Sequence, residues 1–434
     1  MVISRRSGLK CPEFVHENRC WPEFYRVVSN FPHSPVSDTE AVVHKALENV
    51  LDTSGIKDGD RVAVGVGSRN IAGLAVMVRV ICQRIRELGA VPVIVPAMGS
   101  HGGAESQGQI RVLEDLGISE KTCGAAVVSS LDVDQIDTVL DGIPVWFSRD
   151  ALAMDHSVVI NRVKPHTKFK APVESGIYKM MCIGMGKHRG AAELHQAALR
   201  HGFYPVIRAA GDAVIRHSNI RFAVAVVENQ HGEPVEIRAM AAEDFFSEES
   251  RLLELARSCF PRLPFKHLDA LVIGRIGKDI SGSGMDPNVT GRAYDLMEDD
   301  FSINLKATRI ALLDLSDKSG GNAIGLGNAD IITEKLFRKM DYQKTLINAL
   351  TSTSLRKAFI PIRMDDDESA MKTAFFSCGV RRPEDLRAVI IRDTRHATEF
   401  WATSALLDEL IKIPGVTVHE KVALSFSAEG DLLL

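Results

Sequence analysis

Three side chains that could carry chemistry follow one apolar run near the middle of the chain. Ser157–Ile160 is largely β-branched and apolar, which predicts a buried strand. His166 and Lys179 come after this run, and His195 lies in a helical pattern beginning at Gly190. Each side chain alone is also compatible with a surface or packing role. In α/β proteins, however, ligands bind at the carboxyl ends of strands, so the three together predict a functional site.

Two earlier strands end in loops of the same character. Arg61–Val66 leads into Gly67, Ser68 and Arg69, and Val91–Pro96 leads into a glycine-rich loop that contains His101. Each loop is followed by a helical pattern, and this alternation is typical of a parallel, doubly wound sheet. Arg69, His101 and His166 are therefore expected at one crevice. Neither loop matches a GxGxxG or P-loop fingerprint, so no dinucleotide site is predicted.

Length and composition limit the classes of protein to which this chain can belong. The chain has 434 residues, 45% of them apolar, and a net charge of −4, enough for two domains with sizeable cores. An acidic balance argues against nucleic acid as the main partner. The first ten residues lack the apolar segment of a secretory signal, and no run approaches the ~20 apolar residues that cross a bilayer. We expect a cytoplasmic protein without a membrane or nucleic-acid partner, and an oligomer is possible.

The cysteines do not indicate a metal ribbon or a disulfide framework. Their number is odd, no CxxC pair occurs, and we expect most of them to be buried thiols. Cys182 deserves separate notice because it lies close to Lys179 in the sequence. The seven positions are Cys11, Cys20, Cys82, Cys123, Cys182, Cys259 and Cys378.

The chain divides at a proline-bounded segment, 260–264. We expect an N-terminal catalytic domain over 1–260, with its first forty residues forming an irregular arm, and a C-terminal α/β domain over 265–434. The glycine-rich loop 277–288, which contains Lys278, is compatible with a lid or with a binding loop. The fold class is thus two α/β domains with largely parallel sheets and an active site in the cleft between them. Further strands are predicted at 125–130, 139–147, 220–228, 234–240, 268–274, 308–315, 357–362 and 388–391.

The ordered set of motifs resembles the nickel-dependent lactate racemase family, whose members racemise or epimerise 2-hydroxy acids. The motifs are Gly-Ser-Arg at 67–69, Gly-Ser-His at 99–101, Pro165-His166, the SGIYK segment 175–179, and His195. The family has a lysine four residues after the serine of this SGxxK element and a nickel-binding histidine sixteen residues further on, and this chain has the same spacing.

The resemblance implies a cofactor, a nickel pincer nucleotide: a pyridinium mononucleotide whose sulfur arms hold the metal. By resemblance, Lys179 would attach it through a thioamide and His195 would complete the nickel coordination, although His188 could compete for that position. Ser68, Ser175 and Gly176 would contribute to cofactor binding. Loading would require cofactor-assembly proteins as partners.

The resemblance also implies catalytic roles. His101 and His166 would be the acid–base pair that exchanges the substrate hydroxyl proton, while hydride moves to the cofactor and returns to the opposite face. Arg69 would bind the substrate carboxylate, and Lys278 would supply a similar charge from the second domain.

Departures from the family pattern leave the substrate open. The acidic residue that precedes the first-loop arginine in lactate racemases is replaced here by Val66, Gly67 and Ser68, and the Gln/Lys element of the second domain is absent. These differences point to a 2-hydroxy acid other than lactate. Two other functions remain open: a divalent-metal hydrolase or lyase built on His101, His166 and His195, and a non-catalytic protein that binds a small molecule or nucleotide.

Overall fold

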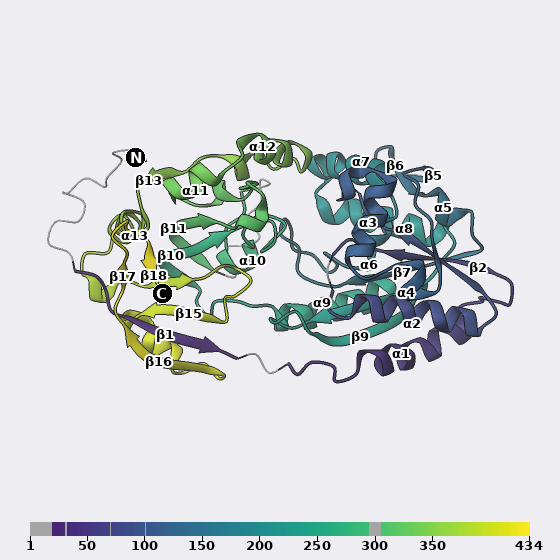
Figure 1. The fold of residues 1–434 in the computed structure, drawn as a ribbon, viewed down its shortest axis with the longest axis horizontal. Coiled ribbons are helices and arrows are strands. Elements are labelled where there is room, and N and C mark those ends of the chain that lie inside the picture. The colour runs from purple at the N-terminus through teal and green to yellow at the C-terminus, as the bar shows by residue number, and fades with distance from the viewer. Residues whose placement is uncertain (1–19, 31–32, 70, 100, 295–304) are drawn as a thin grey trace. The chain divides into compact units, whose positions relative to one another are not determined.

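The described chain forms two compact α/β units. The computed structural model describes residues 20–30, 33–69, 71–99, 101–294 and 305–434. One unit comprises residues 33–260, and the other comprises residues 261–434 together with the segment before residue 33 (Figure 1). Each contains a sheet with mostly parallel pairing, which confirms the predicted α/β fold with largely parallel sheets.

The sheet of unit 33–260 is parallel apart from one edge strand. Among the described residues it has the order β4-β3-β2-β7-β8-β9, and only β9 runs antiparallel to its neighbour. The strand pair predicted around residue 230 is β8 with β9. The strands are β2 (Arg61–Val66), β3 (Val91–Pro96), β4 (Ala126–Val127), β7 (His156–Arg162), β8 (Ile220–Glu228) and β9 (Pro234–Ala241).

The two faces of this sheet differ in the size of their side chains. Val62, Val64 and Val66 of β2 alternate onto the face covered by α1 (Thr39–Thr53) and α2 (Leu74–Glu87), where they join one apolar core. Asp38 begins α1 by accepting a hydrogen bond from the amide of Ala41 at 3.0 Å. Ala63 and Gly65 of β2 alternate onto the opposite face, and Gly65 leaves room there for Met185, in the segment that follows Lys179.

A separate hairpin, β5 (Val133–Val139) and β6 (Ile143–Ser148), packs on α7 (Lys187–His201) and α8 (Phe203–His217). The predicted strand 125–130 is present as the shorter β4, and the predicted strand 139–147 overlaps β6 but begins at the last residue of β5. Gly142, at φ 94°, lies in the tight turn between the two hairpin strands, and the predicted strand 139–147 ran through this turn. The other helices and turns are η2 (His101–Ala104), α3 (Ser106–Asp115), α4 (Glu120–Cys123), α5 (Arg149–Leu152), α6 (Ile177–Lys179), η3 (Met180–Gly184), η4 (Ala242–Asp244) and α9 (Phe245–Cys259).

The second unit has a mixed sheet in the order β13-β12-β11-β10-β14-β15-β1-β16. Its first five strands are parallel, and β15, β1 and β16 are antiparallel to their neighbours. The strands are β1 (Phe24–Ser29), β10 (His267–Ile276), β11 (Lys306–Leu315), β12 (Ile331–Thr333), β13 (Ile362–Met364), β14 (Ala388–Ile391), β15 (Glu399–Thr403) and β16 (Val416–Val422), with a small pair, β17 (Ser425–Phe426) and β18 (Leu432–Leu433).

Strand β1 corrects the predicted domain boundaries. The expectation was that 1–260 forms one domain and that the first forty residues are irregular. Instead, Phe24–Ser29 pairs with β15 and β16 of the second unit, and the purple strand lies between yellow ones in Figure 1. The fully buried Phe24 joins the core of that unit, so apolar burial against distant residues decides where this segment belongs.

The helices of the second unit surround its sheet, and one predicted strand is absent from the described residues. Residues 355–358 form a short 3-10 turn and Pro361 follows, so only residues 362–364 pair as a strand. The helices and turns are α10 (Pro287–Thr290), η5 (Asp317–Ser319), η6 (Leu326–Asn328), α11 (Glu334–Lys339), α12 (Tyr342–Thr351), η7 (Leu355–Ala358), α13 (Asp367–Phe376), η8 (Pro383–Asp385), η9 (Ser404–Leu406) and α14 (Leu407–Leu410).

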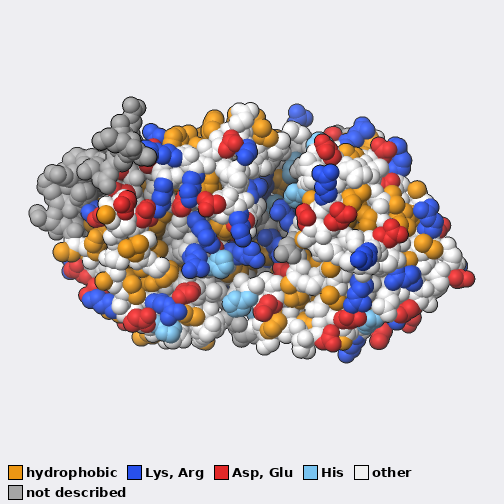
Figure 2. Space-filling model, viewed as in Figure 1, with side chains coloured by type: hydrophobic (Ala, Val, Ile, Leu, Met, Phe, Trp, Pro, Cys, Tyr) orange, Lys and Arg blue, Asp and Glu red, His pale blue; other side chains and the backbone are white. Residues whose placement is uncertain are grey.

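The surface carries charges of both signs. Figure 2 shows acidic and basic side chains interspersed over each unit in that view. None of the described helices has the length and apolar character needed to cross a membrane.

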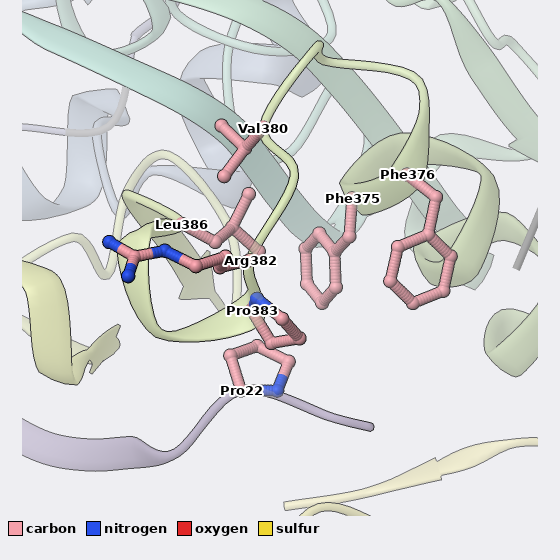
Figure 3. A pocket seen from close by; sticks show the side chains of 7 residues that line it. All are labelled: Pro22, Phe375, Phe376, Val380, Arg382, Pro383 and Leu386. Atoms are coloured by element: carbon pink, nitrogen blue, oxygen red, sulfur yellow. The ribbon is translucent and has the colours of Figure 1, made fainter. Parts of the chain in front are cut away.

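A small hollow in the second unit is lined mostly by apolar side chains from α13 and the segment that follows it, with Pro22 at its lower end (Figure 3). Its one charged residue, Arg382, is bonded to Asp385 at 2.6 and 2.8 Å. The hollow therefore offers packing surface rather than chemistry.

Candidate functional site

The carboxyl ends of β2, β3 and β7 lie at one edge of the sheet. Val66 is in register with both Pro96 and Ile160, so the loops that follow the three strands start side by side. The hydroxyl of Ser68 is hydrogen-bonded to Nδ1 of His101, which joins the first two loops directly. The structure thus brings together Ser68 and His101, which the sequence analysis had assigned to cofactor binding and to proton transfer respectively.

The loop after β7 is closed at its base and organised by a buried carboxylate. Lys164 and Ser175 pair through their backbones, with N–O distances of 2.8 and 3.3 Å. Glu174, which is fully buried, accepts from the amide of His166 at 2.5 Å and from Arg257 of α9 at 2.6 Å. Because the carboxylate is charge-paired and satisfied, it fixes the backbone on which the His166 ring sits.

His166 and Lys179 are in direct contact. Nε2 of His166 lies 2.8 Å from Nζ of Lys179, and Nδ1 accepts from the amide of Lys168 at 3.1 Å. With Nδ1 used as an acceptor, a neutral imidazole carries its proton on Nε2 and donates it to the amine. This arrangement requires a lysine with a free electron pair.

The surroundings of Lys179 favour that neutral amine. Burial, followed by the positive charges of Arg69, Lys164 and Lys168, lowers its pKa to about 7. An amine with a pKa near neutrality is a far better nucleophile at physiological pH than an ordinary lysine. Arg69, whose side chain is exposed, contributes to this lowering through its charge.

His195 lies at the edge of an aromatic cluster. The rings of Phe169 and Phe203 stack at 5.5 Å, with His166 4.6 Å from Phe169 and His195 edge-on to Phe203 at 5.9 Å. Burial, followed by the charges of Lys168 and Lys179, lowers the pKa of His195 to about 4. The imidazole is therefore neutral at physiological pH, the form in which histidine binds metals.

The segment after Lys179 is packed unusually closely against the sheet. Met180–Gly184 forms a π-helical turn before α7 begins, an element that often occurs at functional sites. A Cβ on Gly65 would lie 2.8 Å from Sδ of Met185, and one on Gly67 would lie 2.7 Å from Cε of Met180. The small residues of β2 and its loop thus allow the lysine-bearing segment to approach the sheet edge.

Gly176 has a packing role in this structure. A Cβ on it would lie 2.2 Å from Oε1 of Glu249, a fully buried residue of α9. Glu249 accepts from the amide of Tyr178 at 2.8 Å, so it caps the turn that carries Lys179, and burial raises its pKa to about 7. The sequence analysis did not single out Glu249.

Lys187 is a second buried residue that the sequence analysis missed. Its side chain is fully buried, its backbone is left-handed at φ 54°, and its ammonium donates to the carbonyl of Pro96 at 2.5 Å. This contact ties the start of α7 to the end of β3, just before the His101 loop. The adjacent His188 is exposed, whereas His195 lies beside the aromatic cluster.

Lys278 belongs to the other unit. Its ammonium donates to the carbonyl of Gly282 at 2.7 Å and to Oδ1 of Asn348 at 3.3 Å, and its amide donates to Ser319. The side chain thus holds the loop after β10 against α12.

The described side chains do not provide a complete set of ligands for a metal ion. Within the described ranges, no three His, Cys, Asp or Glu side chains lie close enough together to hold an ion. His101, His166 and His195 therefore do not form the three-ligand centre that a divalent-metal hydrolase or lyase would need.

Comparison with known proteins identifies the fold. The structure is similar to that of the lactate racemase apoprotein from Thermoanaerobacterium thermosaccharolyticum, with a TM-score of 0.53 over 86% of this chain and 99% of that one. Sequence identity over this alignment is 14%, so the likeness shows a lactate racemase-like fold. No family model and no curated protein matches the sequence.

Proposed function

We propose that the protein is a racemase or epimerase of a 2-hydroxy acid and that Lys179 carries a nickel pincer nucleotide. The observation that carries this proposal is the contact between a desolvated, nucleophilic Lys179 and the ring of His166 at the carboxyl edge of the sheet. The lactate racemase-like fold supports it, as does the order of the motifs along the chain.

The residues present fit such a cofactor. Attachment through a thioamide needs an uncharged lysine amine, and a nickel ligand needs an unprotonated imidazole. Burial lowers the pKa of Lys179 to about 7 and that of His195 to about 4, so both groups are available in these forms at neutral pH. Imidazole is a suitable nickel ligand, and a metal held mostly by its cofactor needs no cluster of protein ligands.

When bound, the cofactor would supply an acceptor for the electron pair of the substrate C–H bond. The chain's own residues would do the rest. Arg69 would bind the carboxylate, and His101 and His166 would take up and return the hydroxyl proton. Ser68, bonded to Nδ1 of His101, would hold that imidazole in one orientation.

The test is intact mass and nickel content of the chain produced together with cofactor-assembly proteins. We expect a covalent increment and about one nickel per chain. Both should be lost in Lys179→Ala and Lys179→Arg, since neither side chain can form the thioamide. Lys170→Ala, in the same loop, is the matched control and should load normally.

An unmodified, nickel-free chain would overturn the proposal, provided that a lactate racemase loads in the same cells. If that chain still gains thermal stability from small carboxylates, and the gain is lost in Arg69→Ala, the non-catalytic binding function takes its place. A loaded chain should then be screened for interconversion of the two configurations at the carbon that bears the hydroxyl group, across a panel of 2-hydroxy acids.

A further inference from the structure

A histidine and an arginine share one buried carboxylate in the second unit. Asp393 follows β14 and is fully buried. Its Oδ1 accepts from Nδ1 of His396 at 2.7 Å, and its Oδ2 accepts from Nε of Arg275 at 3.2 Å. The side chains of His396 and Arg275 remain 54% and 46% exposed, so a buried anion orients two side chains that solvent can reach.

These residues lie where ligands bind in α/β folds. Arg275 stands near the end of β10, and Asp393 lies two residues after β14. The two strands are parallel neighbours with Ile273 in register with Ile391, so both residues are at the carboxyl edge of the sheet. The amide of Arg275 also donates to the carbonyl of Arg392 at 3.0 Å, which fixes the spacing between the two strand ends.

The hydrogen bonds determine what each exposed group can offer. A carboxylate only accepts, so the proton of a neutral His396 ring lies on Nδ1 and Nε2 is left as an acceptor. Arg275 uses Nε on Asp393, which leaves its terminal nitrogens as donors. Because both groups bond the same carboxylate, the terminal nitrogens of Arg275 and Nε2 of His396 stand within reach of one small molecule.

A donor and an acceptor held on one carboxylate match the two functional groups of a 2-hydroxy acid, which are its carboxylate and its hydroxyl. The carboxylate of a 2-hydroxy acid would accept from Arg275, and its hydroxyl would donate to Nε2 of His396. A carboxylate without the hydroxyl satisfies only the arginine. A phosphate monoester, whose second pKa is about 6, is mostly a dianion at neutral pH, so it brings acceptors alone and leaves the imidazole nitrogen without a donor.

We propose that Arg275 and His396, oriented by Asp393, form a binding site for a 2-hydroxy carboxylate on the second unit. The site needs neither Lys179 nor a cofactor, so it stands independently of the function proposed for unit 33–260. It also differs from the sequence-based expectation for this unit, in which Lys278 supplied the positive charge.

The experiment uses the full-length chain produced without cofactor-assembly proteins, with sodium DL-lactate and sodium propionate as the matched probes. Binding is measured by ligand-observed NMR and by the Hε1 signal of His396. We expect lactate to shift the His396 signal and to bind about fivefold more tightly than propionate, as one additional hydrogen bond allows. Arg275→Ala should weaken both probes about tenfold or more.

His396→Ala separates a ligand contact from a merely structural role. The proposal expects the preference for lactate over propionate to fall to about one, with propionate affinity unchanged. Arg69→Ala, in the other unit, should leave the shift of the His396 signal intact. An unmoved His396 signal would overturn the proposal, as would a shift that survives Arg275→Ala or equal weakening of both probes in His396→Ala.

Discussion

The two units carry their reactive side chains at equivalent sheet edges but hold them in opposite ways. In unit 33–260 the amine of Lys179 is partly buried among other positive charges, and small residues let its segment approach the sheet. In the second unit the anion is buried, and Arg275 and His396 are held outward from it.

The difference has a direct chemical consequence. Burial of a cation without a paired anion shifts its protonation equilibrium and makes a nucleophile. Burial of an anion that bonds two outward groups fixes their direction and leaves them solvated, which suits recognition. The edge in unit 33–260 is thus organised for bond formation and the edge in the second unit for binding. Substitutions at the two edges should therefore change stability in different ways.

The largest expected effect is a loss of stability when the close packing at the sheet edge of unit 33–260 is disturbed. A Cβ on Gly186 would lie 2.3 Å from the carbonyl oxygen of Cys182, and backbone cannot move aside cheaply. Gly186→Ala should destabilise unit 33–260 by about 3 kcal/mol. Gly190→Ala is the matched control, because its Cβ meets only ordinary contacts at 3.4 Å and beyond. It should stabilise the helix by about 0.5 kcal/mol. Hydrogen exchange by mass spectrometry reports each unit separately, and equal effects would show that close packing does not govern this edge.

Removing the buried anion should damage the second edge. Asp393→Asn keeps the shape but places an amide against the donors of Arg275 and His396. We expect a loss of roughly 2 kcal/mol in the second unit, with unit 33–260 unchanged in hydrogen exchange. Stability equal to that of wild type would mean that the carboxylate does not organise these two side chains.

Removing the amine of Lys179 should stabilise the protein, whereas removing the carboxylate of Asp393 should destabilise it. The folded pKa of Lys179 is about 7 against an ordinary 10.5, so folding opposes its protonation. Wild-type stability should therefore rise between pH 7 and pH 10.5, where only the unfolded chain holds the proton. Lys179→Met should raise the free energy of unfolding by roughly 2 kcal/mol at and below pH 7, and the gain should vanish towards pH 10.5. Urea unfolding across this pH range measures it, with Lys57→Met as an exposed control. A constant difference would show that the amine is not desolvated.

The smallest expected effect concerns the carboxyl that caps the turn of Lys179. The pKa of Glu249 is raised from 4.5 to about 7 by burial, so wild-type stability should fall as pH rises from 4.5 through 7. Glu249→Gln does not titrate, and its stability relative to wild type should improve by roughly 1 kcal/mol between pH 5 and pH 8. Thermal unfolding at the two pH values measures the change. No change in this relative stability would mean that Glu249 is already ionised at pH 5.

The sequence predicted the elements that depend on local patterns. The apolar runs of β2, β3 and β7 gave the sheet edge, and with it the convergence of Ser68, His101 and the loop after β7. Residues whose role depends on distant partners were missed. Glu249 reads as one charge in an amphipathic helix, and only the fold shows that it caps a turn about seventy residues earlier in the sequence. The Asp393 cluster was missed for the same reason, because its arginine comes from another strand.

Strand β1 bears on how the chain can be divided. It lies between β15 and β16 and bonds to both, so unit 33–260 is in effect inserted into the other unit after its first strand. A fragment beginning at residue 261 would present two unpaired strand edges and should aggregate. Residues 33–260 are one uninterrupted stretch of chain and could be produced alone. Supplying residues 20–30 as a separate peptide should rescue the other fragment, as a missing strand does in fragment complementation.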